Sequence, residues 1–209
     1  MFQVNWILNK LRISLIVFLL IGCGSHPSKD PLLVYGQKGI DDLGYDVDYS
    51  IKKFSFVNQN GNTVSQEDFK NTVFISDFFF TTCPTICPIM TKQLTRVQAE
   101  LKGENFKIIS HTVNPEYDTE GVLLKYAKNK NADLRNWDFV TGDKQSIYKQ
   151  AAKYLIIAGQ DTTQDVEFVH SEKLILLDQL GRIRGMYDGT DTESVDQLII
   201  DTQWLIKQQ

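Results

Sequence analysis

The sequence has only three cysteines in 209 residues, too few for a disulfide framework in a domain of this size. It also lacks a basic excess. The sequence has 22 Lys and Arg residues and 26 Asp and Glu residues, and the net charge of -4 argues against a nucleic-acid binder. Hydrophobic residues make up 42% of the chain and aromatic residues 11%. This composition and length predict one main domain with a sizeable core and an N-terminal extension.

The N-terminal apolar run, Ile13 to Ile21, is too short to cross a bilayer, since it has about nine residues for a hydrocarbon core of about 30 Å. It follows Lys10 and Arg12 and leads into Leu-Ile-Gly-Cys23, which resembles a bacterial lipobox. In a lipobox the chain is cut before the cysteine, and the cysteine is lipidated. We therefore expect residues 1–22 to be a lipoprotein signal peptide. A plain signal anchor that starts further upstream is the alternative.

Cys23 would then anchor the protein to the extracytoplasmic side of a bacterial membrane. Residues 24 to about 50 are dense in Gly, Pro and Ser, which predicts a tether followed by irregular structure. We expect residues 23–50 to form this tether and residues 51–209 to form the folded domain.

Strand and helix patterns alternate along residues 51–209. Strands are expected at 54–57, 63–64, 73–80, 106–113, 137–140, 166–169, 173–178 and 182–187. Helices are expected after Ser65, at 86–102, near 122–126, at 146–154 and at the C-terminal end. This order predicts an α/β domain of thioredoxin-like fold, with a central mixed sheet flanked by helices. An N-terminal hairpin begins it, and the strand–helix segment 137–154 would form an inserted extra layer.

Cys83 and Cys87 lie between the apolar strand and the following helix, where open α/β sheets place their sites. The free N–H groups at a helix N-terminus favour thiolates, so both cysteines should have lowered pKa values. If the pair spans one helical turn, the two side chains face the same way. Two thiolates so placed could bind one soft cation such as Cu(I), or they could close into a disulfide.

Several absences weigh against other dithiol proteins. Thioredoxin-type reductases have two residues between their cysteines, whereas here there are three. General reductases of this fold also keep a proline before a late strand, but no proline follows Pro115. A peroxiredoxin would need a proline seven residues before its cysteine, and Ser76 stands there. A purely structural disulfide remains an alternative.

Three histidines are candidates for a third metal ligand. His26 lies in the expected tether, and His111 lies within an apolar strand, where a hydrogen-bonded structural role is commoner. His170 precedes a late strand, in a loop that faces the cysteine loop in this fold. Two thiolates and one imidazole from His170 would suit copper as Cu(I) or Cu(II).

The run Phe-Phe-Phe-Thr-Thr-Cys83-Pro-Thr-Ile-Cys87-Pro resembles the copper-binding loop of the Sco/SenC family of copper chaperones. The segments at 54–61, 112–119, 137–142 and 169–171 are similar to further family patterns, so the likeness covers about residues 51–207. The resemblance implies copper bound by Cys83, Cys87 and His170. It also implies delivery of this copper to the CuA site of cytochrome c oxidase subunit II.

The family often has Val-Asp-Pro where this chain has Val-Asn114-Pro, so any acid–base role of that aspartate is in doubt here. Asp77 is a second unusual residue, because it lies inside an apolar strand where a buried carboxylate needs compensation. It could accept a proton during thiol chemistry or be hydrogen-bonded scaffold.

Three functions stay open. The first is a copper metallochaperone, which binds and transfers rather than catalyses. The second is an extracytoplasmic thiol–disulfide oxidoreductase that reduces the oxidase copper-site cysteines. The third is a redox or copper sensor. The expected partners are subunit II, an upstream copper donor or thiol reductant, and the membrane through the lipid anchor, with no nucleic acid.

Overall fold

The computed structural model describes residues 32–156 and 171–208, and from Leu32 onward the chain forms one compact unit. Its strands are β1 (Gly39–Ile40), β2 (Asp46–Val47), β3 (Ser55–Asn58), β4 (Thr63–Ser65), β5 (Val73–Phe79), β6 (Phe106–Thr112), β7 (Trp137–Thr141), β8 (Lys173–Leu177) and β9 (Ile183–Asp188). Its helices are the 3₁₀ helix η1 (Gln66–Phe69), α2 (Ile86–Glu100), α3 (Glu120–Asn129), α4 (Lys144–Lys153) and α5 (Thr192–Ile206). The predicted alternation of strands and helices is confirmed for these residues.

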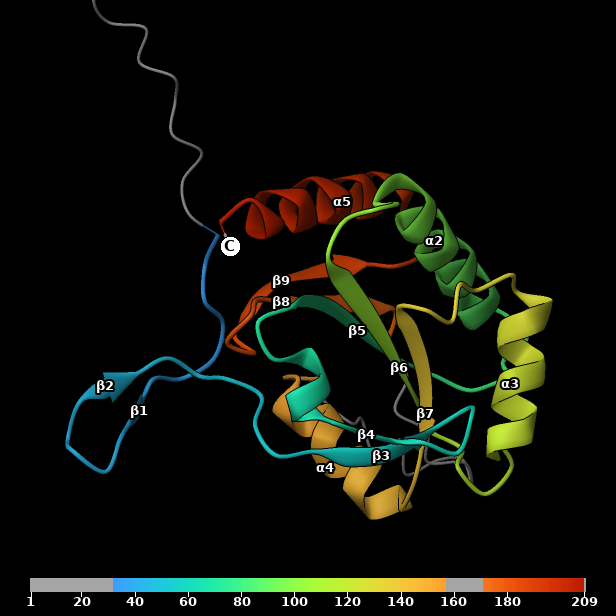
Figure 1. The fold of residues 1–209 in the computed structure, drawn as a ribbon, viewed down its shortest axis with the longest axis horizontal. Helices are drawn as coiled ribbons and strands as arrows, with labels where there is room; N and C mark the ends of the chain where they lie inside the picture. Colours follow the sequence, from blue (N-terminus) through green and yellow to red (C-terminus); the bar gives the residue numbers. More distant parts are fainter. Residues whose placement is uncertain (1–31, 157–170, 209) are drawn as a thin grey trace, which may run out of the picture. The chain divides into compact units, whose positions relative to one another are not determined.

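One mixed sheet of seven strands, in the order β4-β3-β7-β6-β5-β8-β9, forms the centre of the domain (Figure 1). The middle strands β5, β6 and β7 are parallel, and β5 also pairs antiparallel with β8. Every residue of β5 is buried, which explains why its sequence is an almost continuous apolar run. Because β5 and β6 are parallel and in register, their carboxyl ends meet at one edge of the sheet, and the cysteine loop leaves the sheet there.

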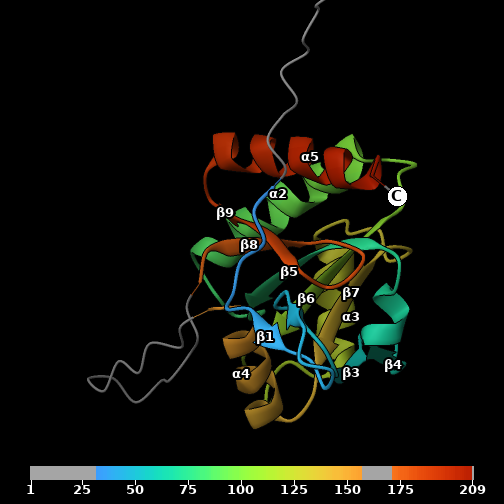
Figure 2. The same ribbon diagram turned by 90° about the vertical axis from the view of Figure 1, so that its left-hand side faces the viewer.

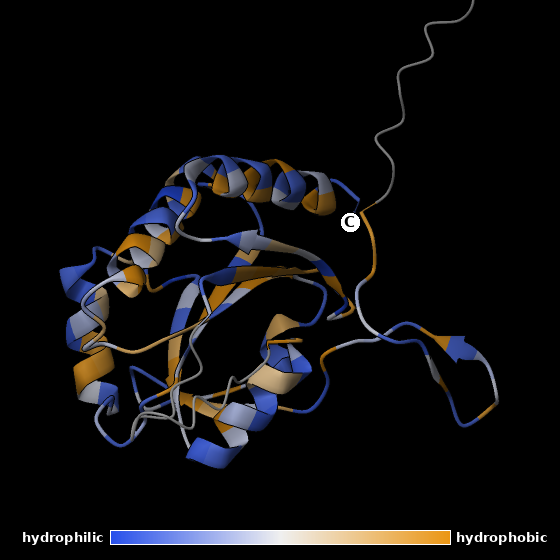
Figure 3. Cartoon of the chain, turned by 180° about the vertical axis from the view of Figure 1, so that it is seen from behind, coloured by the Kyte–Doolittle hydropathy of each residue, from blue (hydrophilic) through white to orange (hydrophobic). Residues whose placement is uncertain are grey.

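Helices cover both faces of the sheet and divide the interior into two cores. Residues of α2, α3 and α5 pack on one face, whereas α4 and η1 pack on the other. Figure 2 shows α2 and α5 on one side of the sheet and α4 on the opposite side. In Figure 3 the central strands are largely hydrophobic, and the helices alternate between polar and apolar surfaces, as expected for helices that bury one side.

The predicted strand–helix segment 137–154 is present as β7 and α4, but it joins the existing layers and does not form an additional one. β7 lies inside the sheet, between β6 and β3, and α4 covers one face of the sheet with its buried residues Ile147 and Ala151. The expected strand at 166–169 lies outside the described residues. No helix among the described residues is long and apolar enough to cross a membrane.

The segment before residue 51 is more regular than the sequence predicts, because β1 and β2 form a small antiparallel hairpin. The turn between them is stabilised by Asp41, whose carboxylate accepts the N–H groups of Leu43 and Tyr45 at 2.9 Å. Side-chain hydrogen bonds and an ion pair attach the residues that flank this hairpin to the rest of the domain. Arg184 donates to the carbonyls of residues 32 and 33, and Arg182 pairs with Asp48 at 3.1 Å.

Candidate metal centre

The two candidate thiols lie at the connection between the end of β5 and the start of α2. β5 ends at Phe79 and α2 begins at Ile86, so Cys83 lies in the loop and Cys87 in the first turn of the helix. The pair therefore does not occupy one helical turn, as one hypothesis had assumed. Cys83 instead closes a turn, since its N–H donates to the carbonyl of Phe80 at 3.2 Å. Both cysteines are free thiols and both are buried, with 8% and 3% of their surface exposed.

The pKa of Cys83 lies below its ordinary value, as the sequence predicted. Burial raises this pKa, but hydrogen bonds to the backbone and side chains of Cys87 and Thr85 lower it by more. The Thr85 hydroxyl lies 4.0 Å from the Cys83 sulfur. Donors at the start of α2 thus stabilise a thiolate at this position, which makes Cys83 a candidate nucleophile and metal ligand.

The pKa of Cys87 moves the opposite way, and the prediction of a lowered value was wrong for this residue. Burial raises the pKa of Cys87 to about 12, against a smaller lowering by the backbone of Phe80. Negative charge on Cys83 or Asp77 raises it further. The helix N-terminus does not compensate, because Cys87 lies deeper in the core beside other groups that can carry negative charge.

Asp118 holds the cysteine loop against the neighbouring strand. This fully buried carboxylate accepts the N–H of Thr81 at 3.1 Å, the hydroxyl of Thr81, and the hydroxyl of Thr112 at 2.5 Å. It therefore joins the start of the cysteine loop to the end of β6. Sequence reasoning missed this role, since no spacing rule links Asp118 to residues 6 and 37 positions away.

Cys87 is connected to α3 through Thr91. The Thr91 hydroxyl lies 2.8 Å from the carbonyl of Cys87 and 2.8 Å from the hydroxyl of Tyr126. Burial raises the pKa of Tyr126, and negative charge on Cys87, Asp77 or Cys83 raises it further. Tyr126 is thus a neutral phenol near the thiols. Its hydrogen bond with Thr91 attaches α3 to the face of α2 that carries Cys87.

Asp77 is buried on β5 with 2% of its surface exposed. Burial raises its pKa to about 7, although the hydroxyl of Ser110 donates to its carboxylate. The indole N–H of Trp137 in turn donates to the Ser110 oxygen at 2.8 Å. This hydrogen-bonded chain supplies the compensation that a buried acid needs, so the scaffold interpretation of Asp77 has structural support.

His111 is fully buried in the opposite core and lies flat against Phe78, with ring centroids 4.7 Å apart. Burial lowers its pKa to about 3, and its Nδ1 lies 3.3 Å from the carbonyl of Asp77. A neutral imidazole on this face of the sheet is separated from the thiols by β5 and β6. The expected structural role of His111 is consistent with this position.

His170, the third candidate ligand, lies outside the described residues, as do His26 and Cys23. Residues 32–156 and 171–208 hold no group of three or more His, Cys, Asp or Glu side chains that could bind a metal. The site as described therefore consists of the two thiols, and the proposed imidazole ligand stays a prediction.

The chain resembles known proteins over almost its whole length. The family model SCO1/SenC matches residues 46–207. A SCO1 protein homolog from Bacillus subtilis (strain 168) is 34% identical over 201 residues, which cover 94% of this chain and 96% of the homolog. A SCO2-like protein from Rickettsia felis is 27% identical over 188 residues, which cover 83% of this chain and 87% of that protein.

Solved structures show the same fold. BsSco, described with a disulfide switch and as a member of the Sco family of cytochrome c oxidase assembly proteins, superposes with a TM-score of 0.67 at 34% identity, covering 77% of this chain and 95% of that chain. ScoI of Bradyrhizobium japonicum, solved with copper bound, superposes with a TM-score of 0.60 at 23% identity, covering 73% and 96%. The predicted thioredoxin-like fold is confirmed by these neighbours. The chain belongs to the SCO1/SenC family.

Proposed function

We propose that this protein is a copper metallochaperone that carries one copper ion and delivers it to the CuA site of cytochrome c oxidase subunit II. The ligands would be the thiolates of Cys83 and Cys87 and the imidazole of His170. The observation that carries the proposal is the pair of free, recessed thiols at the end of β5, in a chain of the SCO1/SenC family.

The chemistry of the donor groups supports copper as the cargo. Thiolates prefer Cu(I), and an imidazole also suits Cu(II), so this set of ligands could hold either oxidation state. Metal binding requires deprotonated thiols, and the lowered pKa of Cys83 favours its thiolate as the first ligand. Copper would then displace the proton of Cys87, whose burial excludes water from the site.

We also propose that the protein works outside the cytoplasm, held to a bacterial membrane by a lipid on Cys23. An upstream copper donor or thiol reductant would supply it there. Support comes from the lipobox-like sequence before Cys23 and from the apolar run that precedes it.

A second candidate function is thiol–disulfide exchange with the oxidase copper-site cysteines. Two observations favour it. BsSco, at 34% identity, is described with a disulfide switch. In addition, the pKa of Cys83 is lowered and the pKa of Cys87 is raised. In such a pair one cysteine can attack a partner's disulfide, and the other can then release the partner from the mixed disulfide.

A transfer assay separates the two functions. The Cu(I)-loaded protein is mixed with the soluble copper domain of subunit II, whose cysteines are either reduced or joined in a disulfide. A chaperone transfers copper to the reduced domain. An oxidoreductase without copper instead reduces the oxidised domain, and its Cys83–Cys87 disulfide forms in equal amount. Absence of copper transfer to the reduced domain would contradict the delivery role.

A further inference from the structure

Exposed hydrophobic side chains gather on and beside the β1–β2 hairpin. Among residues 32–156 and 171–208, ten large hydrophobic side chains are exposed, and five of them fall between residues 33 and 45. These five are Leu33 at 70%, Tyr35 at 38%, Ile40 at 73%, Leu43 at 80% and Tyr45 at 68%. Single exposed hydrophobic residues are ordinary, whereas a concentration of them marks an interaction surface.

The tip of the hairpin is held together by hydrogen bonds within itself. The Asp41 carboxylate accepts the N–H groups of Leu43 and Tyr45, both at 2.9 Å. The N–H of Asp41 donates to the carbonyl of Tyr45, and the N–H of Gly44 donates to the carbonyl of Asp41, both at 3.0 Å. Ile40, Leu43 and Tyr45 are therefore carried by one compact turn. Because these four N–H groups already have partners, moving the tip out of water costs less.

The hairpin leaves the domain at the end of the sheet that is remote from the thiols. The N–H of Tyr35 donates to the carbonyl of Ile183 at 2.9 Å, and the N–H of Ile51 donates to the carbonyl of Gly181 at 2.8 Å. Both acceptors lie at the β8–β9 turn, beside the amino end of β5. The cysteine loop follows the carboxyl end of β5, about 20 Å away, since a strand of seven residues rises about 3.3 Å per residue.

The described chain also begins at the hairpin end. Arg184 donates to the carbonyls of Leu32 and Leu33 at 2.7 and 3.2 Å, and its ion pair with the buried Asp178 at 3.0 Å holds it in place. Leu32 follows Cys23 by nine positions, and nine residues span at most about 32 Å. A lipid on Cys23 would therefore keep this end of the domain close to the membrane surface.

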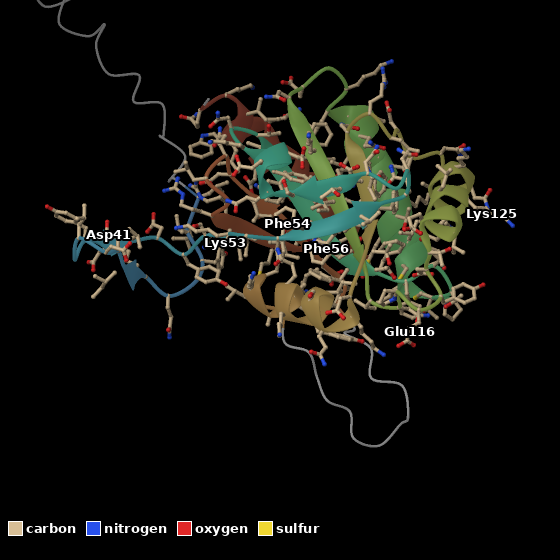
Figure 4. The ribbon with its side chains drawn as sticks, turned by 60° about the horizontal axis from the view of Figure 1, so that its bottom comes forward. Asp41, Lys53, Phe54, Phe56, Glu116 and Lys125 are labelled. Carbon is tan, nitrogen blue, oxygen red and sulfur yellow. The ribbon has the colours of Figure 1, made fainter. Side chains whose placement is uncertain are left out.

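We propose that the β1–β2 hairpin is a membrane contact, which places Ile40, Leu43 and Tyr45 among the lipid headgroups. The inference rests on the proposed lipid anchor. Apolar side chains at the interface add membrane affinity to that of acyl chains, and tyrosine favours the headgroup region. In Figure 4, Asp41 of the hairpin and Glu116, which lies near the cysteine loop, are at opposite ends of the described unit. The thiols then face away from the bilayer, so the copper-accepting site that they meet stands above the membrane surface.

The charges of the hairpin select the kind of lipid surface. Asp42, Asp46 and Lys38 are exposed on it, and Asp48 at its base pairs with Arg182 at 3.1 Å. The exposed hairpin is thus net negative, and an anionic lipid surface repels it. The contact is made to zwitterionic headgroups, and anionic headgroups weaken it most at low salt, where charges are least screened.

The test uses the mature lipidated protein, free of metal, in vesicles of phosphatidylcholine with brominated acyl chains. Tyr45→Trp puts a fluorescent reporter at the hairpin tip. Tyr117→Trp is the matched control, because Tyr117 is also exposed, at 56%, and precedes Asp118, which is bonded to the cysteine loop. Bromine quenches an indole only where lipid touches it, and the signal of the wild type is subtracted. Mass spectrometry of the acylated Cys23 and co-flotation with the vesicles report the anchor separately.

We expect Tyr45→Trp to be quenched and to emit at shorter wavelength than in solution, with Tyr117→Trp unchanged. Adding Ile40→Ser and Leu43→Ser to Tyr45→Trp should abolish the quenching, and phosphatidylglycerol in the vesicles should weaken it at low salt. Equal signals at the two reporter positions, or full quenching in the serine variant, would overturn the hairpin contact in a protein that still floats with the vesicles. That result would leave the anchor and copper delivery intact. A chain that carries no lipid on Cys23 and does not float would overturn the anchor, and the hairpin contact with it.

Discussion

At the scale of single residues, Cys83 and Cys87 differ in chemistry although they share one loop. Cys83 receives hydrogen bonds from the start of α2, which lower its pKa despite burial. Cys87 lies deeper, close to other groups that can be negatively charged, and burial raises its pKa to about 12. The loop therefore presents one thiol that ionises more readily than an ordinary cysteine, and one that ionises only when a metal or an exchange reaction takes its proton.

This asymmetry predicts selective alkylation of the reduced, metal-free protein. Treated with iodoacetamide near pH 7.5, Cys83 should react at least about ten times faster than Cys87, because the thiolate is the nucleophile. Peptide mapping by mass spectrometry at several pH values would give both rates. Equal rates, or faster modification of Cys87, would show that the assignment of the two thiols is wrong.

Asp77 predicts a pH dependence of stability. Its folded pKa of about 7 lies above the unfolded value, so the folded state holds the proton more tightly. Stability therefore falls as pH rises from about 4 through 7, since ionised Asp77 is poorly tolerated in the core. We expect Asp77→Asn to stabilise the reduced, metal-free protein by about 1–3 kcal/mol at pH 8.

At pH 4 the same substitution should give no gain, because Asp77 is already neutral in the folded state. Urea unfolding of both proteins at pH 4, 6 and 8 measures this difference. A difference between variant and wild type that stays constant over the three pH values would exclude Asp77 as the titrating group. Ser110→Ala serves as a control, since it removes the donor to the carboxylate without removing the acid.

At the scale of elements, the geometry of the cysteine loop depends on a contact between two strand ends. Asp118 joins Thr81, at the start of the loop, to Thr112, at the end of β6. Removing the carboxylate leaves buried donors without a partner, and each unpaired buried donor costs about 1–3 kcal/mol. The loop would then be free to shift relative to α2, and with it the position of Cys83.

We expect Asp118→Ala to lower the free energy of unfolding by about 2–4 kcal/mol. It should also weaken Cu(I) binding, although Asp118 touches neither thiol. Thr81→Ser is the matched control, because it keeps the hydroxyl that donates to Asp118. Denaturant unfolding and Cu(I) competition on the same samples measure both effects. Wild-type stability of Asp118→Ala would contradict the role of this contact.

The elements themselves were largely predictable from sequence, whereas several local features were not. The apolar run of β5 and the helical spacing of α2 are local patterns, so they predict the centre of the sheet and the helix after the cysteines. The pairing of Asp118 with Thr81 depends on the topology of β5 and β6, which no local pattern records. The hairpin of β1 and β2 is exposed and short, so it lacks a periodic signal.

At the scale of the whole molecule, a seven-stranded mixed sheet carries the two buried thiols at the carboxyl end of its central strand β5. The parallel register of β5 and β6 brings the cysteine loop and the segment 113–119 to the same edge. The family assignment and the free thiols agree with a protein that binds copper.

The most direct test of this account is Cu(I) binding by the compact unit from residue 32 onward. The reduced protein is titrated anaerobically against a competing Cu(I) chelator, with Cys83→Ser and His170→Ala in parallel. We predict one tightly bound Cu(I) per chain, abolished in Cys83→Ser and weakened at least about tenfold in His170→Ala, since loss of one ligand costs more than about 1.4 kcal/mol. Absence of tight copper in the wild type, or unchanged affinity in both variants, would contradict the copper site.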